Sequence, residues 1–158
     1  MQKKSHIILG ILLAIIFILF LGWLKLDMIE FSLGSAGIIL GITIFYSLLP
    51  DIDHKNSTIT WWFFGIGIIG LIFGILNMKL GLVDFSSLLI IIFSTFLLAF
   101  TFLAVQFFEH RGFTHSIPAG IIASGLLFFL FHNIFYCVMA YVAWHSHLLG
   151  DGYIFKLK

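Results

Sequence analysis

Three short polar segments hold most of the side chains in this sequence that could do chemistry. They read LLPDIDHKNST from Leu48, FFEHRGFTHS from Phe107 and WHSHLLGDGY from Trp144, and each follows a long apolar run. Their imidazole and carboxylate groups, without thiolates, form the ligand set that proteins use for zinc or a similar divalent ion. The sequence therefore predicts a metal site, provided that the fold brings these segments together.

The spacing of the polar residues supports this hypothesis. His147 and Asp151 are four residues apart, so on a helix they share one face and can bind one ion. His110 and His115 flank Gly112, a flexible point that would let both side chains turn inward.

Two further places in the chain supply candidates. Asp51 and Asp53 come directly after Pro50, where a helix is expected to end, so either or both can point into the site. His6 lies at the start of the first apolar run. The complete set of candidate metal ligands is His6, Asp51, Asp53, His110, His115, His147 and Asp151.

The composition places these segments in a membrane protein. The chain has 158 residues, of which 61% are hydrophobic and 9% charged, whereas a soluble domain carries about 25% charged residues. A net charge of +1 without a dense basic tract indicates no nucleic-acid partner. The single cysteine, Cys137, excludes a disulfide framework and a cysteine-based zinc site.

Six apolar segments predict the membrane spans. They are Ile7–Leu24, Leu33–Leu49, Ile59–Leu76, Ser86–Phe108, Ile117–Phe131 and Ile134–Leu149. The first, of about 18 residues, is interpreted as a span because it is too long for the apolar part of a signal peptide. The last two are divided at His132-Asn133, since one straight helix over both would reach about 50 Å across a core of about 30 Å. The sequence predicts an all-α integral membrane protein, a compact bundle of about six transmembrane helices that forms one domain over residues 1–158.

An even number of spans brings both termini and the three polar segments to the same membrane face. Most basic residues are predicted there too: Lys3, Lys4, Lys55, Arg111, Lys156 and Lys158, against Lys25 and Lys79 on the other side. By the positive-inside tendency this shared face is cytoplasmic. We therefore expect a protein of the cell membrane with its termini and metal site at the cytoplasmic face.

Each polar residue taken alone has a simpler interpretation, because such residues are common where membrane helices meet water. His132 at the far-side turn and His145, off the face of His147, are interpreted in this way. Glu109 can equally be a cap, a salt-bridge partner of Arg111 or part of the chemistry. The arrival of all three segments and His6 at one face favours a joint site, since ionisable clusters in membranes are usually functional.

The motifs LLPDIDH, HRGFTHS and HLLGD, in this order and separated by apolar spans, resemble the YdjM-like family of membrane-bound metal-dependent hydrolases. The resemblance covers nearly the whole chain. That family is in turn similar to zinc-dependent phospholipase C and to three-zinc nucleases. The resemblance implies that the ion is zinc and that its ligands are His6, Asp51, His115, His147 and Asp151. Later ligands of a third zinc have no counterpart, so we expect one or two ions.

These considerations predict a phosphoester hydrolase whose nucleophile is a water activated by the ion. One ion would take Asp51, His115, His147 and Asp151; Asp151 would bridge to a second ion on His6, with His110 or Asp53 adding ligands. Asp53 is the expected proton acceptor, and Asp51 is the alternative. Arg111 and Lys55 could hold phosphate oxygens. The bilayer is the expected surrounding, and a phospholipid or other phosphoester is the expected substrate.

Other classes of membrane protein fit the sequence less well. There is no H-E-x-x-H motif of a zincin protease. Lipid phosphate phosphatases share the H-x-x-x-D element, but their Lys/Arg-Pro and Ser-Gly-His motifs are absent. A metal or proton carrier would place polar groups at mid-bilayer, where these spans are nearly bare. The alternative left open is a non-enzymatic metal-binding membrane protein, either a small carrier or a purely structural metal site.

Overall fold

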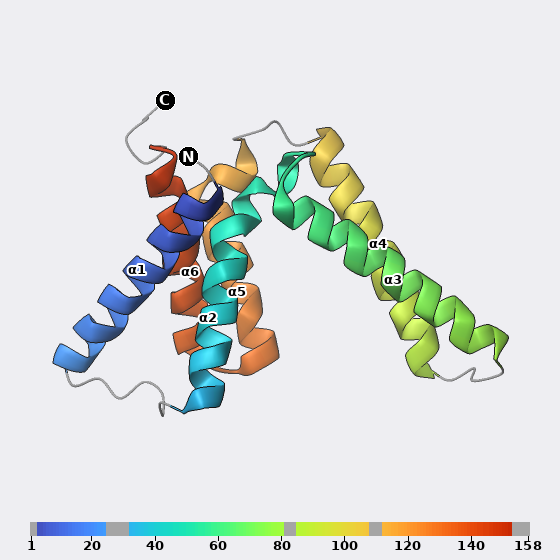
Figure 1. Ribbon diagram of the computed structural model, residues 1–158, viewed down its shortest axis with the longest axis horizontal. Helices are drawn as coiled ribbons and strands as arrows, with labels where there is room; N and C mark the ends of the chain where they lie inside the picture. The colour runs from blue at the N-terminus through green and yellow to red at the C-terminus, as the bar shows by residue number, and fades with distance from the viewer. Residues whose placement is uncertain (1–2, 25–31, 81–84, 108–111, 153–158) are drawn as a thin grey trace. The chain divides into compact units, whose positions relative to one another are not determined.

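The computed structural model describes residues 3–24, 32–80, 85–107 and 112–152, and its regular structure over these ranges is helical throughout (Figure 1). The fold class predicted from the sequence is therefore confirmed. The elements in chain order are α1 (Lys3–Trp23), α2 (Leu33–Leu48), the 3₁₀ helix η1 (Leu49–Asp53), α3 (Thr58–Lys79), α4 (Phe85–Phe107), the 3₁₀ helix η2 (Phe113–His115), α5 (Ile117–Phe131) and α6 (Ile134–Gly150).

Four helical stretches are long and apolar enough to cross a membrane. They are Lys4–Trp23, Leu33–Asp53, Thr58–Lys79 and Phe85–Phe107. Only 17–39% of each of these spans is buried inside the protein, so most of their apolar surface is left for lipid. α5 is a shorter apolar helix of 15 residues, and α6 has 17.

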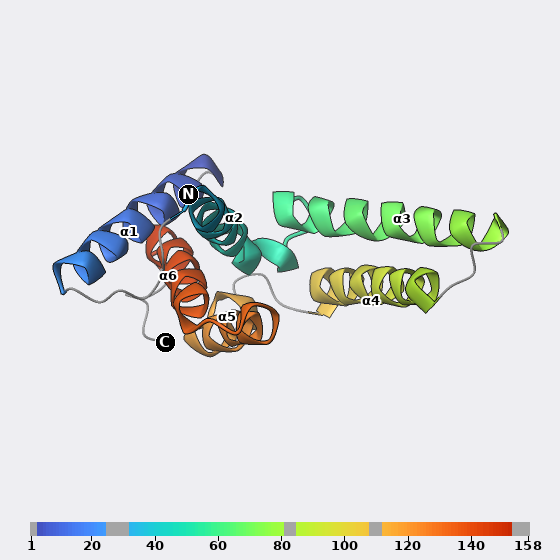
Figure 2. The same ribbon diagram turned by 90° about the horizontal axis from the view of Figure 1, so that it is seen from below.

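The chain packs as two compact units, Met1–Pro50 with Gly112–Lys158, and Asp51–Arg111. The second unit is built from α3 and α4, which lie side by side (Figure 2). Their contact depends on small residues, because a Cβ at Gly67 would meet Leu98 and one at Gly70 would meet Ser94. The prediction of a single domain stays a prediction.

The first unit is organised around α6. This helix packs against α1, α2 and α5, and α1 also packs against α2. Its residues Met139, Ala140 and Ala143 are fully buried and form the centre of the apolar core. The start of α1, the end of α2, η2 and the end of α6 all lie at one end of this unit (Figure 1).

Polar caps determine where several helices begin. The Ser32 hydroxyl accepts a hydrogen bond from the Ser35 amide at 3.1 Å, and Ser35 Oγ accepts one from the Ser32 amide at 2.8 Å. Ser116 caps α5 by accepting a bond from the amide of Ala119 at 3.3 Å. Because Ser116 directly follows His115, the cap that starts α5 also fixes the turn that carries this histidine.

The long apolar segment after residue 117 is divided as the sequence predicts. α5 ends at His132, which adopts the left-handed conformation with φ 48° and donates its amide to the carbonyl of Phe128 at 2.8 Å. The side chain of Asn133 then accepts the amide of Phe135 at 2.9 Å and starts α6. The interpretation of His132 as a turn residue is confirmed.

Two predicted boundaries need correction. α1 begins at Lys3 rather than Ile7, so His6 lies inside the first turns of the helix and not ahead of it. The helical path also continues past Pro50 as the 3₁₀ helix η1, which ends at Asp53. Pro50 has no amide hydrogen to continue an α-helix, but the tighter 3₁₀ geometry keeps the chain helical here.

The end of the first unit at which α1 begins and α6 ends should face the cytoplasm. The first measurement uses a reporter protein that fluoresces only on the cytoplasmic side of the membrane. Fused after Lys158 or inserted within residues 55–58, it is expected to fluoresce. A periplasmic phosphatase at the same two places is expected to be inactive. The control is an insertion within residues 25–31, which should show the reverse. Opposite locations for the first two insertions would contradict the predicted number of spans between them.

Candidate metal centre

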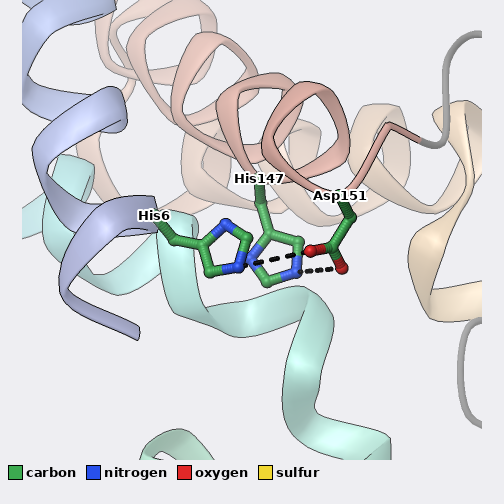
Figure 3. A group of neighbouring side chains, drawn as sticks. All are labelled: His6, His147 and Asp151. Atoms are coloured by element: carbon green, nitrogen blue, oxygen red, sulfur yellow. Dashed lines mark ion pairs between the residues drawn. The ribbon is translucent and has the colours of Figure 1, made fainter. Parts of the chain in front are cut away.

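Three histidines converge on one carboxylate in the first unit. His6 comes from α1, His115 from η2 and His147 from α6, and Asp151 caps the end of α6. The Nε2 atoms lie close to the Asp151 oxygens: His6 at 3.4 Å from Oδ1, and His147 and His115 at 3.6 and 3.8 Å from Oδ2. Figure 3 shows His6, His147 and Asp151 pointing toward one another. These side chains are at most 5% exposed.

The local structure of α6 explains how two of the groups come to share one face. His147 and Asp151 are one helical turn apart, and the amide of Asp151 donates to the carbonyl of His147 at 3.0 Å. This last helical bond holds both side chains on the same side of the helix end. The predicted H-x-x-x-D pair is therefore brought together as expected.

Tight 3₁₀ geometry presents the third histidine. The amide of His115 donates to the carbonyl of Gly112 at 3.1 Å, and the amide of Ser116 donates to Phe113 at 3.1 Å. The Nδ1 atom of His115 lies 3.3 Å from the hydroxyl of Thr114. This contact leaves Nε2 as the ring nitrogen that is directed at Asp151.

The tautomer of His147 follows from its other ring nitrogen. Nδ1 lies 2.7 Å from the backbone carbonyl of Ser47. A carbonyl only accepts hydrogen bonds, so Nδ1 carries the proton. In the neutral ring, Nε2 then presents a lone pair to the carboxylate of Asp151. A hydrogen bond from the other ring nitrogen to a backbone carbonyl is a common way in which proteins orient a histidine that binds a metal.

The distances to Asp151 are longer than those of direct hydrogen bonds and leave room for an ion between the ligand atoms. Hydrogen bonds from imidazole to oxygen are usually 2.7–3.2 Å long, shorter than the 3.4–3.8 Å observed here. Two ligands of a tetrahedral zinc with bonds of about 2.05 Å lie about 3.4 Å apart. Suitable ligand atoms of His6, His147 and Asp151 all lie within 4.8 Å of one another. The donor set and its spacing therefore fit a divalent ion.

The three imidazole rings also pack against one another. The rings of His6 and His147 are stacked with centroids 4.0 Å apart and an interplanar angle of 15°. The ring of His115 meets His147 edge-on at 5.2 Å. The stack therefore holds the rings of His6, His115 and His147 together beside Asp151.

The predicted acidic residues of the first polar segment lie in η1, which passes into the second unit. Asp53 is buried at 4% exposure, and Asp51 is half-buried. The turn that follows them is closed by the Thr60 hydroxyl, which donates to the carbonyls of Ile52 and His54 at 3.1 and 3.0 Å. A role of Asp51 or Asp53 at the ion stays a prediction.

Several predicted residues have other outcomes. His110 and Arg111, like Glu109, lie outside the described residues, so their predicted roles are not tested. His145 packs its ring on Tyr141 at 4.5 Å and is not part of the histidine cluster. This confirms that it lies off the face of His147.

Sequence reasoning missed two groups that support the site. The carbonyl of Ser47 orients His147 across 100 residues of chain, and no side-chain pattern signals such a backbone contact. Thr114 was also missed, although a hydroxyl directly beside a candidate histidine in HRGFTHS is a usable signal.

Comparison with known proteins identifies one related family. Residues 1–154 match the family described as YdjM inner membrane protein, and this range includes every residue of the histidine cluster. No curated protein and no solved structure matches the chain.

Proposed function

The chain belongs to the YdjM inner membrane protein family, and we propose that it is a membrane-embedded, metal-dependent hydrolase that acts on a phosphoester. The observation that supports this most is the cluster of three buried imidazoles around Asp151, with His147 held as a metal-binding tautomer by Ser47. The family match supports the membrane setting, and the activity is our inference from the cluster.

His6, His147 and Asp151 would hold the ion, and His115 would complete a set of four ligands. Zinc is the expected ion, since it favours tetrahedral nitrogen and oxygen ligands. When bound, the ion would polarise a phosphoryl oxygen and lower the pKa of a coordinated water. A second ion, shared through Asp151, is the proposed arrangement if Asp51 also contributes.

The charge of this ligand set suits an anionic substrate. Three neutral imidazoles and one carboxylate leave a divalent ion with a net positive charge, which favours binding of a phosphate group. Lys55 and Arg111 are proposed to hold the other phosphate oxygens, as cationic donors do in phosphate sites. Asp53 is proposed to accept the proton of the attacking water.

One observation favours a second candidate, a structural ion. Four protein ligands form a closed set, as in structural zinc sites, whereas catalytic zinc sites keep one position for water. Such an ion would join α1, η2 and α6 without catalysing a reaction. The hydrolase proposal therefore requires a coordination position for water. A five-coordinate ion, a protein ligand that water displaces, or a second ion would provide it.

We expect the detergent-purified protein to carry one or two equivalents of a divalent transition metal, as measured by elemental analysis. His147→Ala should lose the ion because it removes the ligand whose tautomer is fixed. The matched control is His145→Ala, two residues away on the same helix, which should keep the wild-type metal content. Equal metal in both variants, or metal that mild washing removes from the wild type, would end the metal-centre hypothesis.

Activity separates the two candidates. Phosphodiester and phosphomonoester lipids in mixed micelles, supplied with zinc or manganese, should be hydrolysed by the wild type and by His145→Ala but not by His147→Ala. If the wild type binds metal stoichiometrically, is stabilised by it against heat, and hydrolyses none of these lipids, the structural candidate is preferred.

A further inference from the structure

The two ligands on α6 are related by the helix itself, but His6 depends on how closely α1 approaches. A close approach occurs at Gly10, one turn after His6 and therefore on the same face of the helix. α1 here contacts both helices that support the site, α2 through Ser47 and α6 through Ser146.

There is no room for a side chain at this contact. A Cβ at Gly10 would overlap Ser47 Oγ and would lie 3.2 Å from Ser146 Oγ and 3.3 Å from Ser47 Cβ. Both serines are fully buried. Their hydroxyls are held by their own helices, since Ser47 donates to Thr43 and Ser146 to Ala143, each at 2.6 Å. Rotating the Ser47 hydroxyl away would break its hydrogen bond and would still leave Ser47 Cβ at 3.3 Å, so a methyl group at Gly10 is expected to push α1 away from Ser47.

Ser47 connects this contact to the histidine cluster. Its hydroxyl limits the approach of α1, and its carbonyl holds Nδ1 of His147. The ring of His6 lies on that of His147 at 4.0 Å. Ser47 thus contacts His147 directly and lies against the helix that carries His6, so a shift of α1 away from Ser47 is expected to move His6 relative to His147.

We propose that Gly10 is a positioning residue for the metal centre: its missing side chain lets α1 approach Ser47 and Ser146 closely enough for His6 to bind the same ion as His147 and Asp151. This rests on the proposed metal site, though not on the hydrolase activity. Metal–ligand distances vary by only about 0.2 Å in good sites, so a small displacement of α1 is enough to remove His6 from the ion.

The chain offers a matched control on the same helix. Gly22 is the other described glycine of α1, and a Cβ there would meet nothing within 4 Å. Metal-free protein in detergent would be titrated with Zn²⁺ against a chromophoric chelator, and with Co²⁺ for its visible absorption spectrum. Gly10→Ala should weaken Zn²⁺ binding by about 10–100-fold, as loss of supporting contacts does at other sites, and should change the Co²⁺ spectrum. Gly22→Ala should bind as the wild type does.

Two double variants separate positioning from general destabilisation. In a His6→Ala background, Gly10→Ala should have no further effect on Zn²⁺ affinity, because the ligand that it positions is gone. Combined with Ser47→Ala, which removes the overlapping hydroxyl, Gly10→Ala should bind within about threefold of Ser47→Ala alone. This pair also decides the matter if Gly10→Ala alone does not yield folded protein.

The outcomes distinguish this proposal from the metal site on which it rests. If the wild type binds neither Zn²⁺ nor Co²⁺, the metal site itself is wrong. If the wild type binds both and Gly10→Ala binds them equally well, only the positioning role is overturned. The positioning role is also overturned if Gly10→Ala weakens Zn²⁺ binding in the His6→Ala background as strongly as in the wild type. It is likewise overturned if adding Ser47→Ala to Gly10→Ala fails to restore Zn²⁺ binding.

Discussion

Asp151→Asn is expected to release at least one ion and to weaken Zn²⁺ binding by more than about 100-fold, the upper end of the loss seen when only a supporting contact is removed. All three imidazoles of the cluster face this carboxylate. Asparagine keeps the size and one oxygen ligand but removes the negative charge that offsets the dication. Elemental analysis and competition with a chelator would measure the loss.

Thermal unfolding adds an independent measurement of this prediction. A ligand that binds only the folded state stabilises it by about 2.7 kcal/mol at 100 times its dissociation constant. Zn²⁺ should therefore raise the unfolding temperature of the wild type and leave that of Asp151→Asn unchanged. Asp84→Asn, which alters a carboxylate outside the three polar segments, is the control and should respond as the wild type does. A variant at Asp151 that retains metal and responds to Zn²⁺ would contradict the proposed centre.

The parts of the site that depend on local spacing could be predicted from the sequence. The interval between His147 and Asp151 places both on one face of any helix, and the pair is found there. The turn at His132 and Asn133 was also predictable, because a membrane limits the length of a helix and these two residues interrupt the apolar run.

The parts that depend on packing could not be predicted. In a membrane protein the residues that face lipid and those that face other helices are both apolar, so apolar patterns do not show which helices pair. The approach of α1 to Ser47 therefore left no clear signal in the sequence. The glycines of α3 do mark a face for close packing, but not that α4 is the helix that packs on it. The boundary at Lys3 was missed because the polar start of α1 does not look like a membrane span.

Asp53→Asn should have the opposite pattern to Asp151→Asn: metal content should persist while turnover falls by about 10²–10⁴-fold, the usual contribution of general-base assistance. Asp53 is buried at the end of η1, and asparagine has nearly the same size, so the turn closed by Thr60 should be kept. Asparagine removes the proton-accepting oxygen and the charge. Rates would be measured on the lipid that the wild type hydrolyses, at saturating Zn²⁺.

Two comparisons decide what such a fall means. Asn56→Ala changes an exposed side chain of the same loop and should leave both metal content and turnover near those of the wild type. Asp51→Asn should lose metal if Asp51 is a ligand, and the reverse result, with metal lost from Asp53→Asn and retained in Asp51→Asn, would exchange the two roles. Full turnover in both aspartate variants would show that neither carboxylate accepts the proton. The base would then have to be sought among the remaining polar groups, and Asp53 would be a buried residue of the η1 turn alone.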